Sequence, residues 1–173
     1  MLKVAVKINL GCGTKYKNGW INVDYYDKST CDVVWDLNKY PYPFKKDYAD
    51  EIEIVGLLNV LNDLERFMDE VARILKPGGI IRIIVPHASN VYAHGAFSKY
   101  TFTLNSMNAF DPKMATDPRS NKFEIVSKKL RFQPTHRIFG WFNYLINRFP
   151  SFGEKWIGKI IPIDEVEFVL KKR

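Results

Sequence analysis

Two glycines and two aspartates stand where three neighbouring strands of the chain would end. Residues 3–10 read as a strand that runs into Gly11 and Gly13, a second apolar run ends at Asp24, and a third is followed by Asp36. Glycines let a ligand approach the backbone amides, while carboxylates can accept hydrogen bonds from ribose hydroxyls and an exocyclic amine. Each aspartate taken singly is typical of a turn or a helix cap. Together they predict a nucleoside site on one edge of a sheet.

The spacing of the glycines restricts the kind of nucleoside. Residues 11–16 lack the third glycine of the dinucleotide fingerprint, and the chain contains no phosphate-binding loop of the ATP and GTP type. A nucleoside without phosphates remains, and S-adenosylmethionine (SAM) fits that description.

Strand and helix signals alternate along residues 1–86. Strands are expected at residues 3–10, 20–25, 31–37, 51–58 and 80–85. Apolar residues from Leu64 to Leu75 follow a helical period, and Asn62 with Glu65 would cap that helix. We therefore predict an α/β fold with a Rossmann-like, doubly wound, mostly parallel sheet and a reduced helical layer near the N-terminus.

The second half of the chain gives weaker signals. Residues 87–118 are polar, aromatic and irregular, and we interpret them as a lid or acceptor-binding insertion within a single domain, residues 1–173. Strands are expected at residues 122–132 and 164–171. Between them, an apolar helical stripe from Ile138 to Phe149 is stopped by Pro150. Such a stripe can dock on a membrane or a partner, but burial within its own domain is the commoner use.

Several motifs together resemble a known family, the small type-eleven-like class I SAM-dependent methyltransferases. The motifs are residues 8–13, 19–24, 32–37, 41–44, 73–79 and 82–87. The resemblance is close over residues 7–87 and loose in the final strand. Motifs in this order and at this spacing are specific for the cofactor fold and carry little information on the methyl acceptor.

The resemblance implies a role for each matching residue. Gly11 and Gly13, with Asn9 and Cys12 beside them, would face the methionine part of SAM. Asp24 would bind the ribose.

Asp36 and the amide of Leu37 would bind the adenine, and residues 41–44 would help to wall the adenine pocket or pack as a turn on the core. The product of the reaction would be S-adenosylhomocysteine (SAH).

Two departures from the family pattern leave a second function open. Asn9 stands where relatives often have an acidic residue, so its bond to the cofactor's ammonium would carry no charge. Residues 56–61 lack the two histidines and the glutamate that relatives often carry after the fourth strand. The alternative is a non-catalytic SAM- or SAH-binding protein or regulatory subunit.

His87 is the candidate catalytic residue. Methyl transfer from a sulfonium is an in-line displacement that needs alignment, exclusion of water and, for a hydroxyl or ammonium acceptor, a general base. His87 directly follows the fifth strand, and His94 and Tyr92 lie in the next loop. A structural role in the turn is the competing interpretation of His87. No cluster has metal-ligand spacing, so no metal is expected.

Composition and charge limit the kinds of partner that the protein can have. Cys12 and Cys31 form no disulfide or zinc pattern, and no signal peptide or membrane span is visible, so a cytoplasmic protein is expected. The net charge is +7, and residues 111–173 carry 13 Lys and Arg against 7 Asp and Glu. A small-molecule acceptor is preferred. Methylation of RNA or DNA through the basic C-terminal portion is possible but not favoured, because no nucleic-acid motif accompanies the charge.

Overall fold

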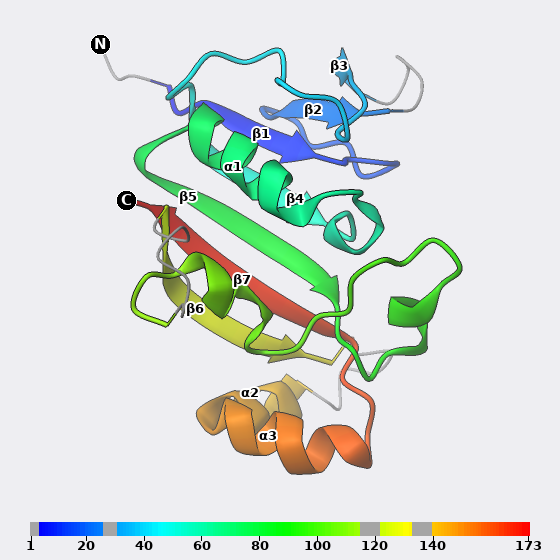
Figure 1. Ribbon diagram of the computed structural model, residues 1–173. Coiled ribbons are helices and arrows are strands. Elements are labelled where there is room, and N and C mark those ends of the chain that lie inside the picture. Colours follow the sequence, from blue (N-terminus) through cyan, green and yellow to red (C-terminus); the bar gives the residue numbers. More distant parts are fainter. Residues whose placement is uncertain (1–3, 26–30, 115–121, 133–139) are drawn as a thin grey trace.

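One seven-stranded sheet forms the centre of the computed structural model, which describes residues 4–25, 31–114, 122–132 and 140–173. The strand order is β3-β2-β1-β4-β5-β7-β6 (Figure 1). The strands are β1 (Lys7–Leu10), β2 (Ile21–Asp24), β3 (Val33–Val34), β4 (Ala49–Val55), β5 (Leu75–Pro86), β6 (Phe123–Arg131) and β7 (Glu165–Lys172). β1 to β5 are parallel, and β7 is antiparallel to both β5 and β6. The predicted α/β, Rossmann-like, mostly parallel sheet is confirmed.

The strand order reverses beside β1. The chain proceeds outward from β1 through β2 to β3, and then returns to place β4 on the other side of β1. Loops that leave β1 and β4 therefore diverge at the carboxyl edge of the sheet. Ligands of open α/β sheets bind at such a switch point, which is where the sequence places Gly11 and Gly13.

Helix α1 (Leu64–Ile74) connects β4 to β5. Its N-cap is Asp63, whose side chain accepts a hydrogen bond of 2.9 Å from the Arg66 amide. The expected cap at Asn62 is therefore wrong by one residue. The reason is that the Asn62 side chain accepts from Lys99, which leaves the neighbouring carboxylate to satisfy the first turn.

The first face of the sheet is apolar and packs against α1. Side chains that are register partners on neighbouring strands lie in rows across this face. One such row consists of Leu10, Ile54, Ile83 and Phe168, each of which is fully buried. Phe67, Met68, Val71 and Ile74 of α1 belong to the same core cluster. Figure 1 shows α1 lying along the sheet over β1 and β4. Burial of these side chains is the main stabilising contribution of this half of the molecule.

The second face of the sheet is polar. A row across four parallel strands consists of Asn22, Asn9, Glu53 and Arg82, which are register partners. Arg82 continues the row by bonding to Glu167 of β7 at 3.0 and 3.1 Å. In the described part of the chain no helix joins β1 to β2. Hydrogen-bonded and ion-paired side chains thus occupy a face that a parallel sheet usually covers with helices.

The segment after β5 folds back over the carboxyl edge. It contains two short 3₁₀ helices, η2 (Val91–His94) and η3 (Ser106–Phe110). His87 forms a parallel bridge with Phe102, and Phe102, Leu104 and Met107 are buried in the core. Of the predicted insertion at residues 87–118, the part up to residue 114 is described, and it is anchored by these apolar side chains.

Two helices cover the edge strand β6 at the lower end of the view in Figure 1. They are α2 (Gly140–Arg148) and α3 (Pro150–Trp156), and the 3₁₀ turn η5 (Ile157–Lys159) follows. Asn147 donates to and accepts from the backbone of Leu130 in β6, and Asn143 does the same with Phe132 just beyond β6, over 2.8–3.1 Å. Two amide side chains thereby satisfy an exposed strand edge that would otherwise be open to pairing.

The predicted helical stripe is only partly buried. Ile146 is buried and Phe142 half-buried, but Leu145 and Phe149 are exposed. Ile138 lies outside the described residues. Pro150 ends α2 as expected and also begins α3, since proline is well suited to the first helical turn.

Candidate functional site

The turn after β1 brings backbone amides to the carboxyl edge. The amides of Gly11 and Cys12 donate to the Val23 carbonyl at 2.8 and 3.1 Å, so the turn is held against β2. Gly11 and Gly13 have φ values of +72° and +50°, a region that residues with a Cβ rarely adopt. A Cβ at Gly11 would also lie 3.1 Å from the Leu57 side chain. The two glycines therefore allow a conformation that leaves space at the strand end.

Asp24 links this turn to β2. Its Oδ2 atom accepts a hydrogen bond of 2.7 Å from the Gly13 amide, and the residue is buried. The carboxylate thus fixes the glycine turn and lies in the wall of a cavity beside it.

Asp36 and Leu37 complete one side of that cavity. Asp36 follows β3, and its Oδ1 accepts from the Asn38 amide at 3.0 Å in a tight turn. The cavity has a volume of about 340 Å³ and is lined by Gly11, Asp24, Tyr25, Asp36, Leu37, Asn38, Leu57, Val60 and Leu61. Two carboxylates and several apolar side chains therefore face one space, as a nucleoside with a polar sugar and a flat base requires.

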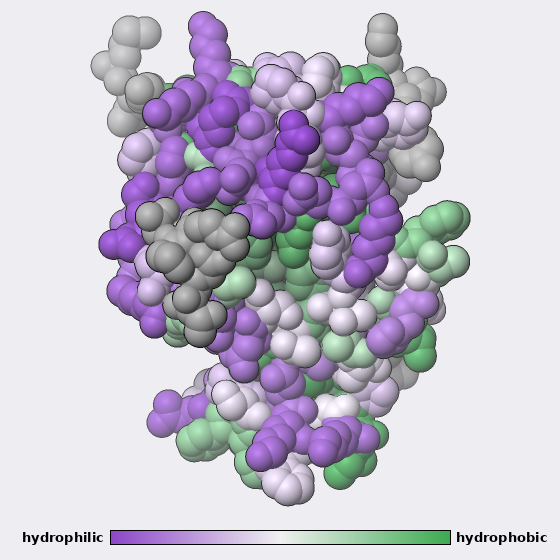
Figure 2. All heavy atoms as spheres, viewed as in Figure 1, coloured by the Kyte–Doolittle hydropathy of each residue, from purple (hydrophilic) through white to green (hydrophobic). Residues whose placement is uncertain are grey.

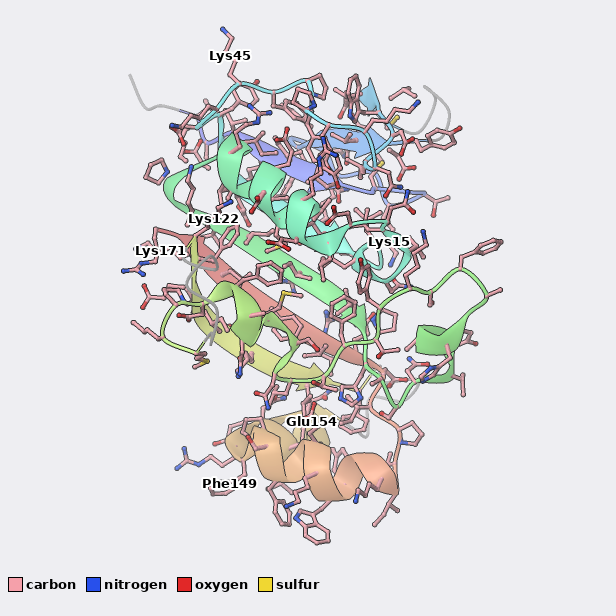
Figure 3. All side chains as sticks on the ribbon, viewed as in Figure 1. Lys15, Lys45, Lys122, Phe149, Glu154 and Lys171 are labelled. Atoms are coloured by element: carbon pink, nitrogen blue, oxygen red, sulfur yellow. The ribbon has the colours of Figure 1, made fainter. Side chains whose placement is uncertain are left out.

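A second cavity adjoins the first at Gly11. Its volume is about 300 Å³, and it is lined by Asn9, Gly11, Cys12, Gly13, Thr14, Lys15, Lys17, Glu53, Val55 and Gly56. Figure 3 shows Lys15 at this edge of the sheet. The seven residues predicted to bind the cofactor all line one cavity or the other.

Asn9 lies in a network of side-chain hydrogen bonds. Its amide nitrogen donates to the Lys15 carbonyl at 3.1 Å and to Asn22 Oδ1 at 2.9 Å. Both amide hydrogens are used, so the group that Asn9 can offer a ligand is its oxygen, an acceptor. Asn22 is held in turn by Asp32, and hydrogen bonds from the Asn22 backbone and side chain lower the pKa of Asp32.

Lys17 and Glu53 are cavity residues that the sequence analysis missed. Lys17 donates to Glu53 Oε1, and Arg82 donates to Glu53 Oε2 at 3.1 Å. Burial raises the pKa of the Glu53 carboxyl, but hydrogen bonds from Lys17 and Arg82 outweigh burial and hold the pKa below its ordinary value. The signal in the sequence was a glutamate alternating with buried apolar residues inside a predicted strand.

Cys12 does not have the properties of a nucleophile. Burial is the largest effect on its thiol, and with the nearby Asp24 it raises the pKa to about 11. The thiol is therefore protonated at neutral pH, and the thiolate is the reactive form. Cys12 and Cys31 are both buried and free of disulfide bonds. Among the described residues, no group of His, Cys, Asp and Glu side chains is arranged to hold a metal ion.

Residues 41–44 do not line the first cavity. Tyr42 is buried, its hydroxyl donates to the Leu37 carbonyl at 2.8 Å, and its amide donates to Glu70 Oε1. This segment supports Leu37 from the core side. Of the two interpretations, the structure favours a turn that packs on the core.

His87 lies at the carboxyl end of β5 with both ring nitrogens engaged. Nδ1 accepts from the Ser89 amide at 3.1 Å and lies 2.8 Å from Ser89 Oγ, and Nε2 lies 3.0 Å from Glu154 Oε1. Because Nδ1 accepts from an amide, Nε2 carries the hydrogen that bonds to Glu154. His87 is buried and lines neither of the two cavities.

Several solved structures with the same architecture are SAM-dependent methyltransferases. One is a SAM-dependent methyltransferase from Mesorhizobium loti, with 16% identity over 96% of this chain and 90% of that chain and a TM-score of 0.62. Another is from Archaeoglobus fulgidus, with 16% identity over 98% of this chain and 86% of that chain and a TM-score of 0.56. The chain has the class I SAM-dependent methyltransferase fold.

The sequence comparison agrees with this fold. Residues 12–83 match the profile of a family described as a methyltransferase domain, which confirms the resemblance seen in the motifs. A search of curated proteins found no match. The family match and the structural neighbours together support SAM as the cofactor.

The fold by itself does not define the reaction. The cyclase SpnF also matches, with 12% identity over 99% of this chain and 76% of that chain and a TM-score of 0.60. A reaction must therefore be argued from the site of this chain.

The residues present fit SAM. The glycine turn leaves room for a close approach to the backbone, two carboxylates line the first cavity beside apolar side chains, and Asn9 and the Lys17–Glu53 pair line the second. The nucleoside of SAM is uncharged and offers hydroxyls and an amine as donors, whereas its methionine end carries both an ammonium and a carboxylate. Acceptors in the first cavity and side chains of both charges in the second match that division.

Proposed function

We propose that this protein transfers a methyl group from SAM to a small-molecule acceptor. The observation that carries the proposal is the convergence of Asn9, Gly11, Cys12, Gly13, Asp24, Asp36 and Leu37 on two cavities that share Gly11. These residues come from the ends of three consecutive strands, β1, β2 and β3, and their types suit the two halves of one cofactor.

In the first cavity, Asp24 binds the ribose hydroxyls and Asp36 accepts from the adenine amine. The Leu37 amide and the apolar side chains of Leu57 and Leu61 hold the base. A hydrogen bond to a charged carboxylate contributes about 1.5–3 kcal/mol. The apolar walls exclude water from the base.

In the second cavity, the glycine turn faces the methionine part of SAM. The Asn9 oxygen and Glu53 accept from the ammonium, and Lys17 donates to the carboxylate. Glu53 thereby supplies a negative charge near the position of Asn9, where members of the resembled family often have an acidic residue. The pairing of Lys17 with Glu53 also means that this end of the site carries both charges before the cofactor binds.

SAM supplies an electrophilic methyl group on a positively charged sulfur. The acceptor's lone pair forms a bond to the methyl carbon while the carbon–sulfur bond breaks, and its electron pair stays on sulfur in SAH. The protein's part is alignment and exclusion of water. The described part of the segment that follows β5, residues 87–114 of the predicted insertion at residues 87–118, is the acceptor-side wall because it folds over the carboxyl edge of the sheet.

As a general base, His87 would use Nδ1, the ring nitrogen without a hydrogen, and exchange its Ser89 amide contact for the acceptor while Nε2 stays bonded to Glu154. A His87→Gln variant tests that role through the pH profile of kcat. Loss of the acidic limb of that profile, where a general base becomes protonated and inactive, supports a base if the fold is intact. An unchanged profile with a lowered melting temperature assigns His87 to positioning the segment after β5.

The function is tested by following a radiolabelled methyl group from SAM into fractionated cell extract. Label in the small-molecule fraction, reduced about ten- to hundredfold at low SAM by Asp36→Ala and unchanged by Asp69→Ala on the surface of α1, is the expected result. Label in RNA or DNA would contradict the small-molecule acceptor. Tight SAH binding without any labelled product would favour the regulatory alternative.

A further inference from the structure

The outer side of the C-terminal helices carries an unusual set of exposed side chains. Phe149, Phe152 and Trp156 are exposed, and Ile160 just beyond them is 83% exposed. Arg148, Lys155 and Lys159 lie among them and are also exposed. We call the six aromatic and basic residues from Arg148 to Lys159 the aromatic–basic surface. Large exposed aromatic groups of this kind mark interaction sites.

The aromatic–basic surface is one face of the helices. Phe152, Lys155, Trp156 and Lys159 are spaced three and four residues apart, which places them together along α3 and η5. The opposite face is packed: Gly153 is buried, and a Cβ there would lie 2.2 Å from Ile146. The helices are therefore already docked on their own domain by the other side, and the aromatic face is left outward.

The charge on this surface is uniformly positive. Residues 140–161 contain Arg148, Lys155 and Lys159 and a single acidic residue, Glu154. Glu154 points inward, where its carboxylate bonds to His87 and to the Leu104 amide. Figure 3 shows Glu154 between α3 and the sheet and Phe149 at the left-hand end of the helices. The outward face thus presents cations and aromatic rings with no carboxylate of its own.

The cations and rings are arranged in pairs. The Arg148 guanidinium carbon lies 5.9 Å from the Phe149 ring centroid, and Lys155 Nζ lies 5.7 Å from the Trp156 centroid. A ring beside a long basic side chain suits a lipid–water boundary, where the ring enters the acyl region and the charge reaches the headgroups. In the space-filling view the lower end of the molecule mixes hydrophobic and hydrophilic residues over α2 and α3 (Figure 2).

We propose that the aromatic–basic surface docks the protein on an anionic phospholipid membrane. No helix among the described residues is long and apolar enough to cross a membrane, so the attachment is peripheral. Glu154 of α3 accepts from the Leu104 amide and bonds to His87, both in the segment that follows β5. The helices that carry the docked surface are therefore joined directly to the acceptor-side wall, although docking does not depend on which acceptor is used.

The test is co-sedimentation with vesicles of equal parts phosphatidylcholine and phosphatidylglycerol, and with phosphatidylcholine vesicles. The expected result is binding to the mixed vesicles that weakens at high salt, with much weaker binding to phosphatidylcholine. The double variant Lys155→Glu and Lys159→Glu is expected to lower the partition coefficient by about tenfold or more. Lys45→Glu, at an exposed site on the opposite end of the molecule (Figure 3), is the charge control and should bind nearly as the wild type does.

The apolar contribution is tested with Phe152→Ser and Trp156→Ser combined. Both side chains are exposed, so the variant should fold, and it should lose vesicle binding, while Val4→Ser at a distant exposed site should not. Wild-type protein that fails to sediment with mixed vesicles would overturn the proposal. So would a lipid-free dimer in analytical ultracentrifugation that the double serine variant abolishes, because the surface would then belong to a second copy of the chain.

Discussion

The two faces of the central sheet are stabilised by different kinds of interaction. On one face, rows of fully buried aliphatic and aromatic side chains pack against α1. On the other, Asn22, Asn9, Glu53 and Arg82 form a polar row that ends in the Arg82–Glu167 pair. The first face gains stability from area removed from water. The second depends on hydrogen bonds and ion pairs among polar side chains, of which Asn22, Asn9 and Glu53 are buried.

The polar face has a second use. Asn9, Lys17 and Glu53 belong to its network and also line the cavity assigned to the methionine part of SAM. A helix layer over this face would have covered these groups. The face of the sheet that has no covering helix layer in the described part of the chain is therefore also the face that supplies charged side chains to the candidate site.

The largest expected effect is on the apolar face. Ile83→Ala removes a fully buried side chain between β4 and β7 and leaves a cavity. We expect the free energy of unfolding to fall by about 2–5 kcal/mol. Urea denaturation of the purified variant measures this change. A decrease in the free energy of unfolding smaller than that of the polar-face variants would contradict the proposed difference between the two faces.

An intermediate effect is expected in the middle of the polar row. Glu53→Gln keeps the shape of the side chain but removes the charge that Lys17 and Arg82 share. Arg82 retains Glu167, so we expect a loss of about 1–3 kcal/mol in the free energy of unfolding. The same urea experiment applies, with Glu51→Gln, a more exposed residue on the same face of β4, as the matched control.

The polar face should also give the molecule a pH dependence. Because the pKa of Glu53 is lower in the folded than in the unfolded chain, its contribution is fully present above the unfolded value of about 4.3. The contribution is lost as the pH falls through the folded pKa. The stability difference between wild type and Glu53→Gln should therefore shrink as the pH is lowered from neutral into that range. A difference that grows on acidification would reverse the sign and refute this account.

The smallest effect is expected at the rim of the polar face. Lys7 pairs with Glu51 at 2.7 Å, but both side chains are about one-third exposed to solvent. Such pairs contribute about 0–1 kcal/mol. Lys7→Ala should change the melting temperature little, and raising the salt concentration should remove most of the difference.

The sequence predicts those parts of the fold that follow from local pattern. Strand ends marked by glycine and aspartate, and the apolar period of α1, led to the sheet and to Gly11, Gly13, Asp24 and Asp36. Asn9, Cys12 and Leu37, which also line the two cavities, came from the family resemblance. Asn22 and the Lys17–Glu53 pair were missed because their partners are set by strand register across the sheet, which one strand does not reveal. The N-cap of α1 was misplaced for the same reason. Asn62 is engaged by Lys99, a residue distant in sequence, so Asp63 caps the helix instead.

The C-terminal helices show where periodicity misleads. A stripe of apolar residues predicts a buried face, yet Leu145 and Phe149 are exposed while Ile146 is buried. The cause is the docking of α2 on β6 through Asn143 and Asn147, two polar residues whose role depends on a strand edge brought close only by folding.

The most direct test of the central claim is titration calorimetry of SAM and SAH with wild type, Asp24→Ala and the surface control Asp69→Ala. We predict that Asp69→Ala binds SAM and SAH as tightly as the wild-type protein does. Asp24→Ala should lose binding while its circular dichroism spectrum still shows a folded protein. Folded wild-type protein that binds neither ligand, or an Asp24→Ala variant that binds them as wild type does, would contradict the assignment of the two cavities to SAM.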